Sequence, residues 1–101
     1  MKSINLLGST GSIGVQTLDV ARAHGYKIES LTAYSNVDVI EKQIREFRPE
    51  YVALVDEKAA ADLKVRVADL PVKVLSGLEG VSFCAAEGKG NITLNSVVGM
   101  A

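Results

Sequence analysis

The sequence predicts an α/β fold, in which a single domain is built on a three-layer parallel sheet with helices on both faces. Two observations lead to this prediction. Short apolar runs alternate strictly with amphipathic, helix-like segments in the order β-α-β-α-β-α-β-α-β. The first run, residues 4–7, is almost continuously apolar, which is typical of a parallel strand covered on both sides. Right-handed crossovers between such strands place helices against the sheet.

Each predicted element is bounded by residues that start or stop regular structure. We expect strands over residues 4–7, 28–33, 51–55, 72–75 and 92–98, and helices over residues 12–23, 37–48, 57–70 and 78–86. Gly25, Pro49 and Pro71 end the first three helices, and Asp56 is placed to cap the third. Two neighbouring apolar ridges are expected on the first helix: Gly14, Leu18 and Ala21, and beside them Ile13, Thr17 and Val20.

Composition narrows the classes of partner. The net charge is −1, with 48% hydrophobic and 23% charged residues, so the charge favours neither nucleic acid nor a membrane surface. No apolar stretch approaches the roughly 18 residues of a membrane-spanning helix. The N-terminus runs into a strand without a signal-like segment, and the single cysteine, Cys84, fits a reducing compartment. We therefore expect a cytoplasmic protein without a nucleic-acid or membrane partner.

The most informative stretch lies between the first strand and the first helix, where residues 8–14 read GSTGSIG. The first N–H groups of a helix lack intrahelical partners and lie at the positive end of its dipole, so they attract phosphate. The G-x-x-G-x-x-G spacing in this context predicts a Rossmann-like, NAD(P)-binding domain over residues 1–101. Val15 stands where a Walker-type loop would have lysine, which excludes that kind of loop.

Each glycine of this loop has an expected role. We expect Gly8 to make the tight exit from the strand, Gly11 to let the backbone approach a phosphate, and Gly14 to let the helix pack closely on the strand. Three hydroxyls are expected either to bind phosphate or to cap the helix, namely those of Ser9, Thr10 and Ser12. The alternative is that the stretch is only a turn rich in glycine and serine.

The segment after the second predicted strand bears on which dinucleotide is bound. NAD sites usually have Asp or Glu there, about 20 residues beyond the loop, to bind the ribose 2′-hydroxyl. Here the segment reads Tyr34-Ser35-Asn36, without a carboxylate, which favours NADP over NAD. We expect Ser35 and Asn36 to donate to the 2′-phosphate and Tyr34 to flank the adenine, with no Arg or Lys to balance the phosphate charge. Asn36 is equally well placed as the N-cap of the following helix.

Two other reactive side chains are assigned structural roles. His24, the only histidine, lies at the far end of the first helix from the glycine loop. We expect it to be the basic residue of the last turn, before a left-handed cap at Gly25. Cys84 is expected to be a small buried hydrophobe, because no basic neighbour would stabilise its thiolate.

The opening of the chain also resembles a known family. Residues 6–14 (LLGSTGSIG), followed by residues 17–20 (TLDV), closely resemble the start of 1-deoxy-D-xylulose 5-phosphate reductoisomerase. Segments like residues 31–37, 74–77 and 97–101 occur in that family in the same order, so the resemblance covers the whole chain.

The resemblance implies an NADPH-dependent oxidoreductase of the non-mevalonate pathway of isoprene biosynthesis. The family rearranges a phosphorylated sugar, 1-deoxy-D-xylulose 5-phosphate, and reduces the product to 2-C-methyl-D-erythritol 4-phosphate, using Mg²⁺, Mn²⁺ or Co²⁺. Its members are typically homodimers. By resemblance, the cofactor contacts are Thr10, Gly11, Ser12 and Ile13, with Asn36 at the adenosine end. The family usually has Gly-Lys or Gly-Arg before this asparagine, where this chain has Tyr34-Ser35.

The resemblance also implies that the reacting groups lie elsewhere. The family's metal-binding carboxylates, substrate-phosphate residues and lid all lie beyond Ala101, so no catalytic or metal-binding residue is assigned in this chain. Because the chain stops just past an apolar, strand-like run, we expect a truncated N-terminal fragment that is inactive on its own. The expected cofactor-binding residues are Gly8, Thr10, Gly11, Ser12, Ile13, Gly14, Ser35 and Asn36.

Two alternatives stay open at the level of the sequence. One is another NADP-dependent reductase with a G-x-T-G-x-x-G loop, such as a semialdehyde-phosphate or extended short-chain dehydrogenase, whose active-site signature would lie further along. The other is a non-catalytic nucleotide-sensing module, like those that gate ion transport. Such modules usually carry an acidic residue after the second strand, which this sequence lacks.

Overall fold

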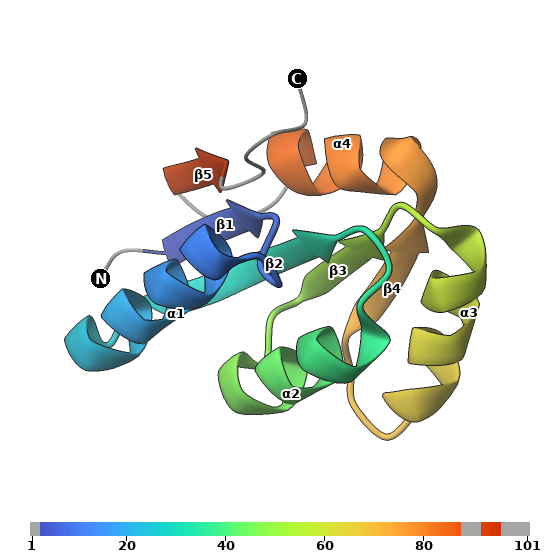
Figure 1. Ribbon diagram of the computed structural model, residues 1–101, viewed down its shortest axis with the longest axis horizontal. Helices are drawn as coiled ribbons and strands as arrows, with labels where there is room; N and C mark the ends of the chain where they lie inside the picture. Colours follow the sequence, from blue (N-terminus) through green and yellow to red (C-terminus); the bar gives the residue numbers. More distant parts are fainter. Residues whose placement is uncertain (1–2, 88–91, 96–101) are drawn as a thin grey trace.

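The computed structural model describes residues 3–87 and 92–95 and confirms the alternating order of strands and helices (Figure 1). The strands are β1 (Ser3–Leu7), β2 (Lys27–Ala33), β3 (Tyr51–Leu54), β4 (Lys73–Ser76) and β5 (Ile92–Asn95). The helices are α1 (Ser12–His24), α2 (Val37–Phe47), α3 (Glu57–Arg66) and α4 (Gly77–Glu87). The described strand pairs are all parallel, as the apolar runs predict.

The strand order in the sheet is β4-β3-β2-β1-β5. From β1 the chain moves outward through β2, β3 and β4, and it then returns to the other side of β1 to add β5. Because the crossovers are right-handed, this return places α4 on one face of the sheet and α1, α2 and α3 on the other (Figure 1). The three-layer prediction is confirmed, and the switch in strand order falls beside β1.

The main apolar core lies between the sheet and the helices packed on it. Leu6, Leu31 and Val52 are register partners across β1, β2 and β3, so their side chains share one face of the sheet. All three are fully buried, together with Ile40 and Ile44 of α2 in the same cluster. This layer holds the strands in register and thereby fixes the position of the loops at their carboxyl ends.

Only one of the two predicted ridges of α1 is buried. Gly14, Leu18 and Ala21 face the core, as expected. The adjacent ridge is turned outward, with Ile13 45% and Val20 52% exposed. The physical reason is the close packing of α1 at Gly14, which fixes the rotation of the helix about its axis; successive residues project about 100° apart, so the neighbouring ridge points away.

Element ends differ from the predicted ones by a few residues. Helix α3 ends at Arg66 because the following residues form tighter turns, in which Leu70 N–H donates to the Val67 carbonyl at 2.9 Å. Asp56 caps this helix, as predicted, by accepting from the N–H groups of Lys58 and Ala59. Residues 96–98 of the last predicted strand lie outside the described residues. In residues 3–87 and 92–95, no helix combines the length and apolar character needed to cross a membrane.

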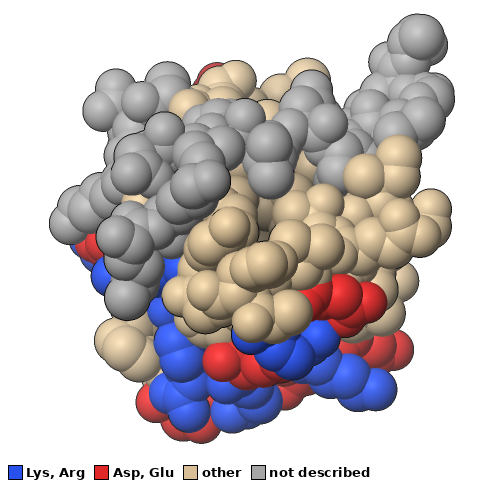
Figure 2. Space-filling view, turned by 90° about the vertical axis from the view of Figure 1, so that its left-hand side faces the viewer, with Lys and Arg blue, Asp and Glu red and all other residues tan. Residues whose placement is uncertain are grey.

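A network of ion pairs joins the outer sides of α1, α2 and α3, and we call it the charged surface. Arg22 of α1 pairs with Glu46 of α2, and Arg66 of α3 pairs with Asp38 of α2 at 2.6 Å. Its members are Asp19, Arg22, Asp38, Glu41, Arg45, Glu46, Asp62, Arg66 and Asp69. Figure 2 shows acidic and basic side chains intermingled over the lower part of one face of the molecule.

Candidate functional site

The glycine-rich loop leaves the carboxyl end of β1 and leads into α1 (Figure 1). It lies at the switch point of the sheet, because β2 pairs with one side of β1 and β5 with the other. The loop over residues 34–36 leaves the same edge, since β1 and β2 are parallel neighbours. The structure thus brings two of the predicted segments to one edge. The third, residues 99–101, lies outside the described residues.

Thr32 of β2 holds the start of the loop. The N–H of Gly8 donates to the Thr32 carbonyl at 2.9 Å and to its hydroxyl Oγ1 at 3.1 Å, while the N–H of Ser9 donates to the same carbonyl at 2.8 Å. Gly8 has a φ of +81°, in the left-handed region that favours glycine. Its predicted role as the tight exit from the strand is confirmed.

Gly14 lets α1 approach the loop backbone closely. A Cβ atom added at this position would meet the Gly8 carbonyl oxygen and would lie 2.8 Å from the Cα and carbonyl carbon of Ser9. Those are backbone atoms, which cannot move aside as a flexible side chain would. The predicted close packing at Gly14 is confirmed, and any side chain there would displace the loop.

The N-terminus of α1 is not capped by a side chain. Its N-cap is Gly11, which has extended dihedral angles (φ −77°, ψ 170°), and no side-chain hydrogen bond caps the helix, so of the two roles expected for the loop hydroxyls, capping is not the one they take. Capping depends on which residue takes the extended N-cap position, and that residue is a glycine. The first turn also lacks an acidic residue. The first N–H groups and the dipole therefore suit a phosphate group.

The other loop residues differ in exposure. Ser9 is fully buried, Thr10 is half-buried, and Ser12 and Ile13 are exposed. Among residues 3–87 and 92–95, a Cβ added at Gly11 would find only the Gly8 carbonyl oxygen within 4 Å, at 3.9 Å, so these residues leave open space on that side of the loop. An open side next to an uncapped helix N-terminus fits a bound pyrophosphate.

Gln43 of α2 is a loop contact that the sequence analysis missed. Its side-chain Nε2 donates to the Ser9 carbonyl at 2.8 Å, across 34 positions of sequence, and the residue is only 8% exposed. The signal in the sequence is its position: Gln43 lies three residues after Ile40 and directly before Ile44, inside the apolar stripe of an otherwise regular amphipathic helix. A polar residue inside such a stripe is informative because buried polar groups are normally hydrogen-bonded.

Asn36 begins α2 at the second loop. Its Oδ1 accepts from the N–H of Val39 at 3.2 Å, so the predicted N-cap is confirmed. The cap does not use the side-chain NH₂ group, which is a donor. Ser35 and Asn36 are exposed and Tyr34 is 62% exposed, so all three side chains are accessible at this edge of the sheet.

The structural roles expected for His24 and Cys84 are confirmed. His24 lies in the last turn of α1 and stacks on Tyr26 at 5.3 Å between ring centres, while Gly25 forms the left-handed cap with φ +68°. Cys84 is fully buried, and burial raises the pKa of its thiol to about 11, which makes it unreactive near neutral pH. Across residues 3–87 and 92–95, no group of three or more His, Cys, Asp or Glu side chains could hold a metal ion.

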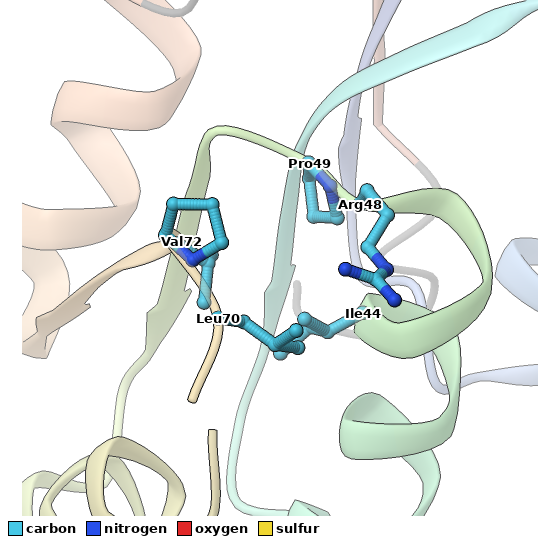
Figure 3. A pocket seen from close by; sticks show the side chains of 6 residues that line it. Ile44, Arg48, Pro49, Leu70 and Val72 are labelled. Atoms are coloured by element: carbon cyan, nitrogen blue, oxygen red, sulfur yellow. The ribbon is translucent and has the colours of Figure 1, made fainter. Parts of the chain in front are cut away.

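A small pocket of about 80 Å³ lies at the opposite edge of the sheet (Figure 3). It is lined by Ile44, Arg48, Pro49, Leu70, Pro71 and Val72. These residues come from the end of α2 and from the segments that enter β3 and β4, at the amino ends of the strands. The pocket is too small for a nucleotide and is separated from the glycine loop by the length of the sheet.

Comparison with known proteins identifies the family. A profile of 1-deoxy-D-xylulose 5-phosphate reductoisomerase matches residues 4–101. The chain belongs to this family. It is 48% identical over 101 residues to the reductoisomerase of Lachnoclostridium phytofermentans and 53% identical over 83 residues to that of Desulfitobacterium hafniense. These alignments cover 99% and 80% of the chain but only 26% and 22% of the relatives, so the chain spans about a quarter of a reductoisomerase.

Solved reductoisomerase structures share the fold. A crystal structure of the enzyme in complex with NADPH, fosmidomycin and magnesium has a TM-score of 0.86 and 34% identity, covering 92% of this chain and 24% of the other. The Zymomonas mobilis enzyme in complex with NADPH has a TM-score of 0.78 and 28% identity, covering 83% of this chain and 23% of the other. Membership of the reductoisomerase family decides against the two alternatives that the sequence left open.

Proposed function

We propose that this chain is the NADPH-binding part of a 1-deoxy-D-xylulose 5-phosphate reductoisomerase. The observation that carries the proposal is the N-terminus of α1, which has neither a side-chain cap nor an acidic first turn and follows a glycine loop at the switch point of a parallel sheet. That N-terminus suits an anion. The NADPH complexes of two structural relatives support a dinucleotide as the source of that anion.

In this proposal, two segments hold the cofactor at one edge of the sheet. The residues that bind it are Gly8, Thr10, Gly11, Ser12, Ile13, Gly14, Ser35 and Asn36. The loop and the first turn of α1 direct N–H groups at the pyrophosphate, and Gly11 keeps the approach open. Exposed Ile13 supplies apolar surface beside the pyrophosphate. When bound, NADPH supplies a hydride, and this chain only binds and orients it.

The second loop selects the 2′-phosphate in this proposal. Asn36 serves two purposes at once, since its Oδ1 caps α2 while its NH₂ group donates to the phosphate. The Ser35 hydroxyl is a second donor, and the nearby N-terminus of α2 adds the positive end of a helix dipole. The absence of a carboxylate over residues 34–36 removes the group that would repel a phosphate dianion.

The activity of the whole enzyme follows from the family. We propose that residues 1–101 are a truncated Rossmann-like domain and that the longer protein rearranges and reduces a phosphorylated sugar in isoprene biosynthesis. A divalent metal, a homodimeric assembly and a cytoplasmic location belong to that longer protein. The groups that bind metal and substrate lie outside this chain, so the 101-residue fragment should be inactive.

Thermal denaturation in the presence of nucleotides tests the proposal. NADPH should raise the midpoint temperature of denaturation of the purified chain, because a ligand that binds only the folded state stabilises that state. NADH should raise this temperature less. No shift with NADPH at millimolar concentration would contradict the proposal. Turnover of 1-deoxy-D-xylulose 5-phosphate by the fragment would contradict the placing of catalysis outside it.

Replacing Asn36→Asp separates the two roles of this residue. Aspartate is as good an N-cap as asparagine, so the midpoint without nucleotide should stay within about 2 °C of the unmodified chain. The added charge repels a 2′-phosphate, so NADPH affinity should fall about tenfold or more while NADH affinity changes little. An equal loss of affinity for NADPH and for NADH would show that Asn36 does not contact the 2′-phosphate.

A further inference from the structure

We propose that Gln43 is a positioning residue, which holds the glycine loop in the orientation that binds the cofactor. The proposal rests on the function proposed above and adds to it a residue that lies outside the phosphate-binding motif. Gln43 is buried under the loop, and its Nε2 donates to the Ser9 carbonyl at 2.8 Å. It is therefore placed to act on the cofactor through the loop backbone.

The bond fixes the direction of a peptide group. A trans peptide is planar, and its C=O and N–H point in opposite directions. Since Gln43 draws the Ser9 carbonyl toward α2, the N–H of Thr10 in the same peptide points away from α2. The Ser9 backbone is also limited from the other side, because it lies against Gly14 of α1. Two helices thus determine how the loop presents its N–H groups.

The same helix carries the other end of the site. Asn36 caps α2, and Gln43 follows seven residues later, which is close to two turns and brings both residues to similar positions around the helix axis. Because α2 is rigid and anchored in the core through Ile40 and Ile44, it sets the spacing between the adenosine end and the pyrophosphate loop. Gln43 links that helix to the loop through a hydrogen bond.

Gln43 satisfies the Ser9 carbonyl, but it also brings a polar group into a buried apolar stripe. Within the described residues, the Gln43 Oε1 and Ser9 Oγ atoms are both buried and have no hydrogen-bond partner. Buried polar atoms without partners are unfavourable, and an apolar side chain of similar length would continue the stripe of Ile40 and Ile44. A polar residue at such a position, bonded to the loop backbone, points to a role in arranging the loop.

Replacing Gln43→Met tests the proposal, with Ile44→Val as the matched control. Methionine keeps the length and unbranched shape of glutamine but cannot donate to Ser9. We expect about tenfold weaker NADPH binding by Gln43→Met at a temperature where the protein is fully folded. Ile44→Val removes a buried methyl group from the adjacent position and should lower the denaturation midpoint while leaving NADPH affinity unchanged.

A second measurement does not depend on the cofactor. Without nucleotide, the amide signals of Thr10 and Gly11 in a ¹H–¹⁵N NMR spectrum should shift, and their hydrogen exchange should be faster, in Gln43→Met but not in Ile44→Val. If the unmodified chain fails to bind NADPH, the proposed function fails, and the loop signals still decide the role of Gln43. Unchanged loop signals in Gln43→Met, or an equal loss of affinity in both variants, would overturn the proposal.

Discussion

The glycine-loop edge and the charged surface are held together by different interactions. At the loop, the contacts are neutral and involve the loop backbone: Gly8 and Ser9 donate to Thr32, the Gln43 side chain donates to the Ser9 carbonyl, and Gly14 packs on the loop backbone. The charged surface is made of ion pairs between side chains that are mostly well exposed. The charged surface contains more charged groups, yet we expect the loop to tolerate substitutions far less well.

The difference follows from solvent. An exposed ion pair has little net effect on stability, because water screens the charges and two long side chains must be ordered. A buried backbone contact has no such alternative partner in water, so disturbing it leaves polar groups unsatisfied or forces the chain apart. A dense network of exposed ion pairs is therefore weak evidence for a functional site. A closely packed, hydrogen-bonded loop without charges is stronger evidence.

The largest expected effect comes from Gly14→Ala. Helix propensity alone predicts that this change stabilises α1 by about 1 kcal/mol. The structure predicts the reverse, because the new methyl group would meet the Gly8 carbonyl oxygen, and we expect a loss of at least about 2 kcal/mol in the free energy of unfolding. Urea denaturation measures it, and unchanged or increased stability would show that α1 does not pack on the loop as described.

Gly11→Val is the matched change on the open side of the same loop. Its φ of −77° suits any residue, and an added Cβ has one neighbour within 4 Å among the residues that the structure describes. The loss of stability should be under about 1 kcal/mol, whereas NADPH binding should be abolished because the side chain would occupy the proposed pyrophosphate position. Calorimetric titration gives the affinity, and an affinity equal to that of the unmodified chain would make Gly11 a turn residue only.

Changes on the charged surface should have much smaller effects. Arg66→Gln removes pairs with Asp38 and Asp62, yet we expect the denaturation midpoint to fall by no more than about 3 °C and NADPH affinity to stay the same. Adding salt to the unmodified chain should produce a similar small decrease. A loss of stability in Arg66→Gln as large as that in Gly14→Ala would show that the charged surface is as sensitive to substitution as the loop.

The pH dependence of stability should be weak for the same reason. Hydrogen bonding to Arg22 lowers the pKa of Glu46, and hydrogen bonding to Arg45 lowers that of Asp69. A carboxyl group with a lowered folded pKa adds stability above its unfolded pKa, and that stability is lost as pH falls through the folded value. The urea concentration at the midpoint of unfolding should therefore stay constant between about pH 7 and pH 5 and fall below about pH 4. The fall should be smaller in Glu46→Gln, which lacks one of these carboxyl groups.

The sequence was most informative where local chemistry decides the structure. Alternating apolar runs predicted the order of elements, and cap residues such as Asn36 and Asp56 predicted where helices begin. The close packing at Gly14 was predicted because a glycine in the first turn of a helix after a strand has few other uses.

What was missed depends on how distant segments meet. The Gln43 contact joins residues 34 apart and is visible only when α2 is placed under the loop. The outward-facing ridge at Ile13 and Val20 follows from the rotation of α1, which periodicity alone leaves undetermined. The N-cap at Gly11 likewise depends on backbone angles rather than on the neighbouring hydroxyls.

The central claim is that the loop edge, and not the charged surface, binds NADPH. The most direct test is a ¹H–¹⁵N NMR titration of the unmodified chain with NADPH, with the amide signals assigned. We predict that the largest shifts fall on residues 8–14 and on Ser35 and Asn36, with little change at Arg45 and Arg66. Shifts centred on the charged surface, or none at a saturating concentration, would contradict the account.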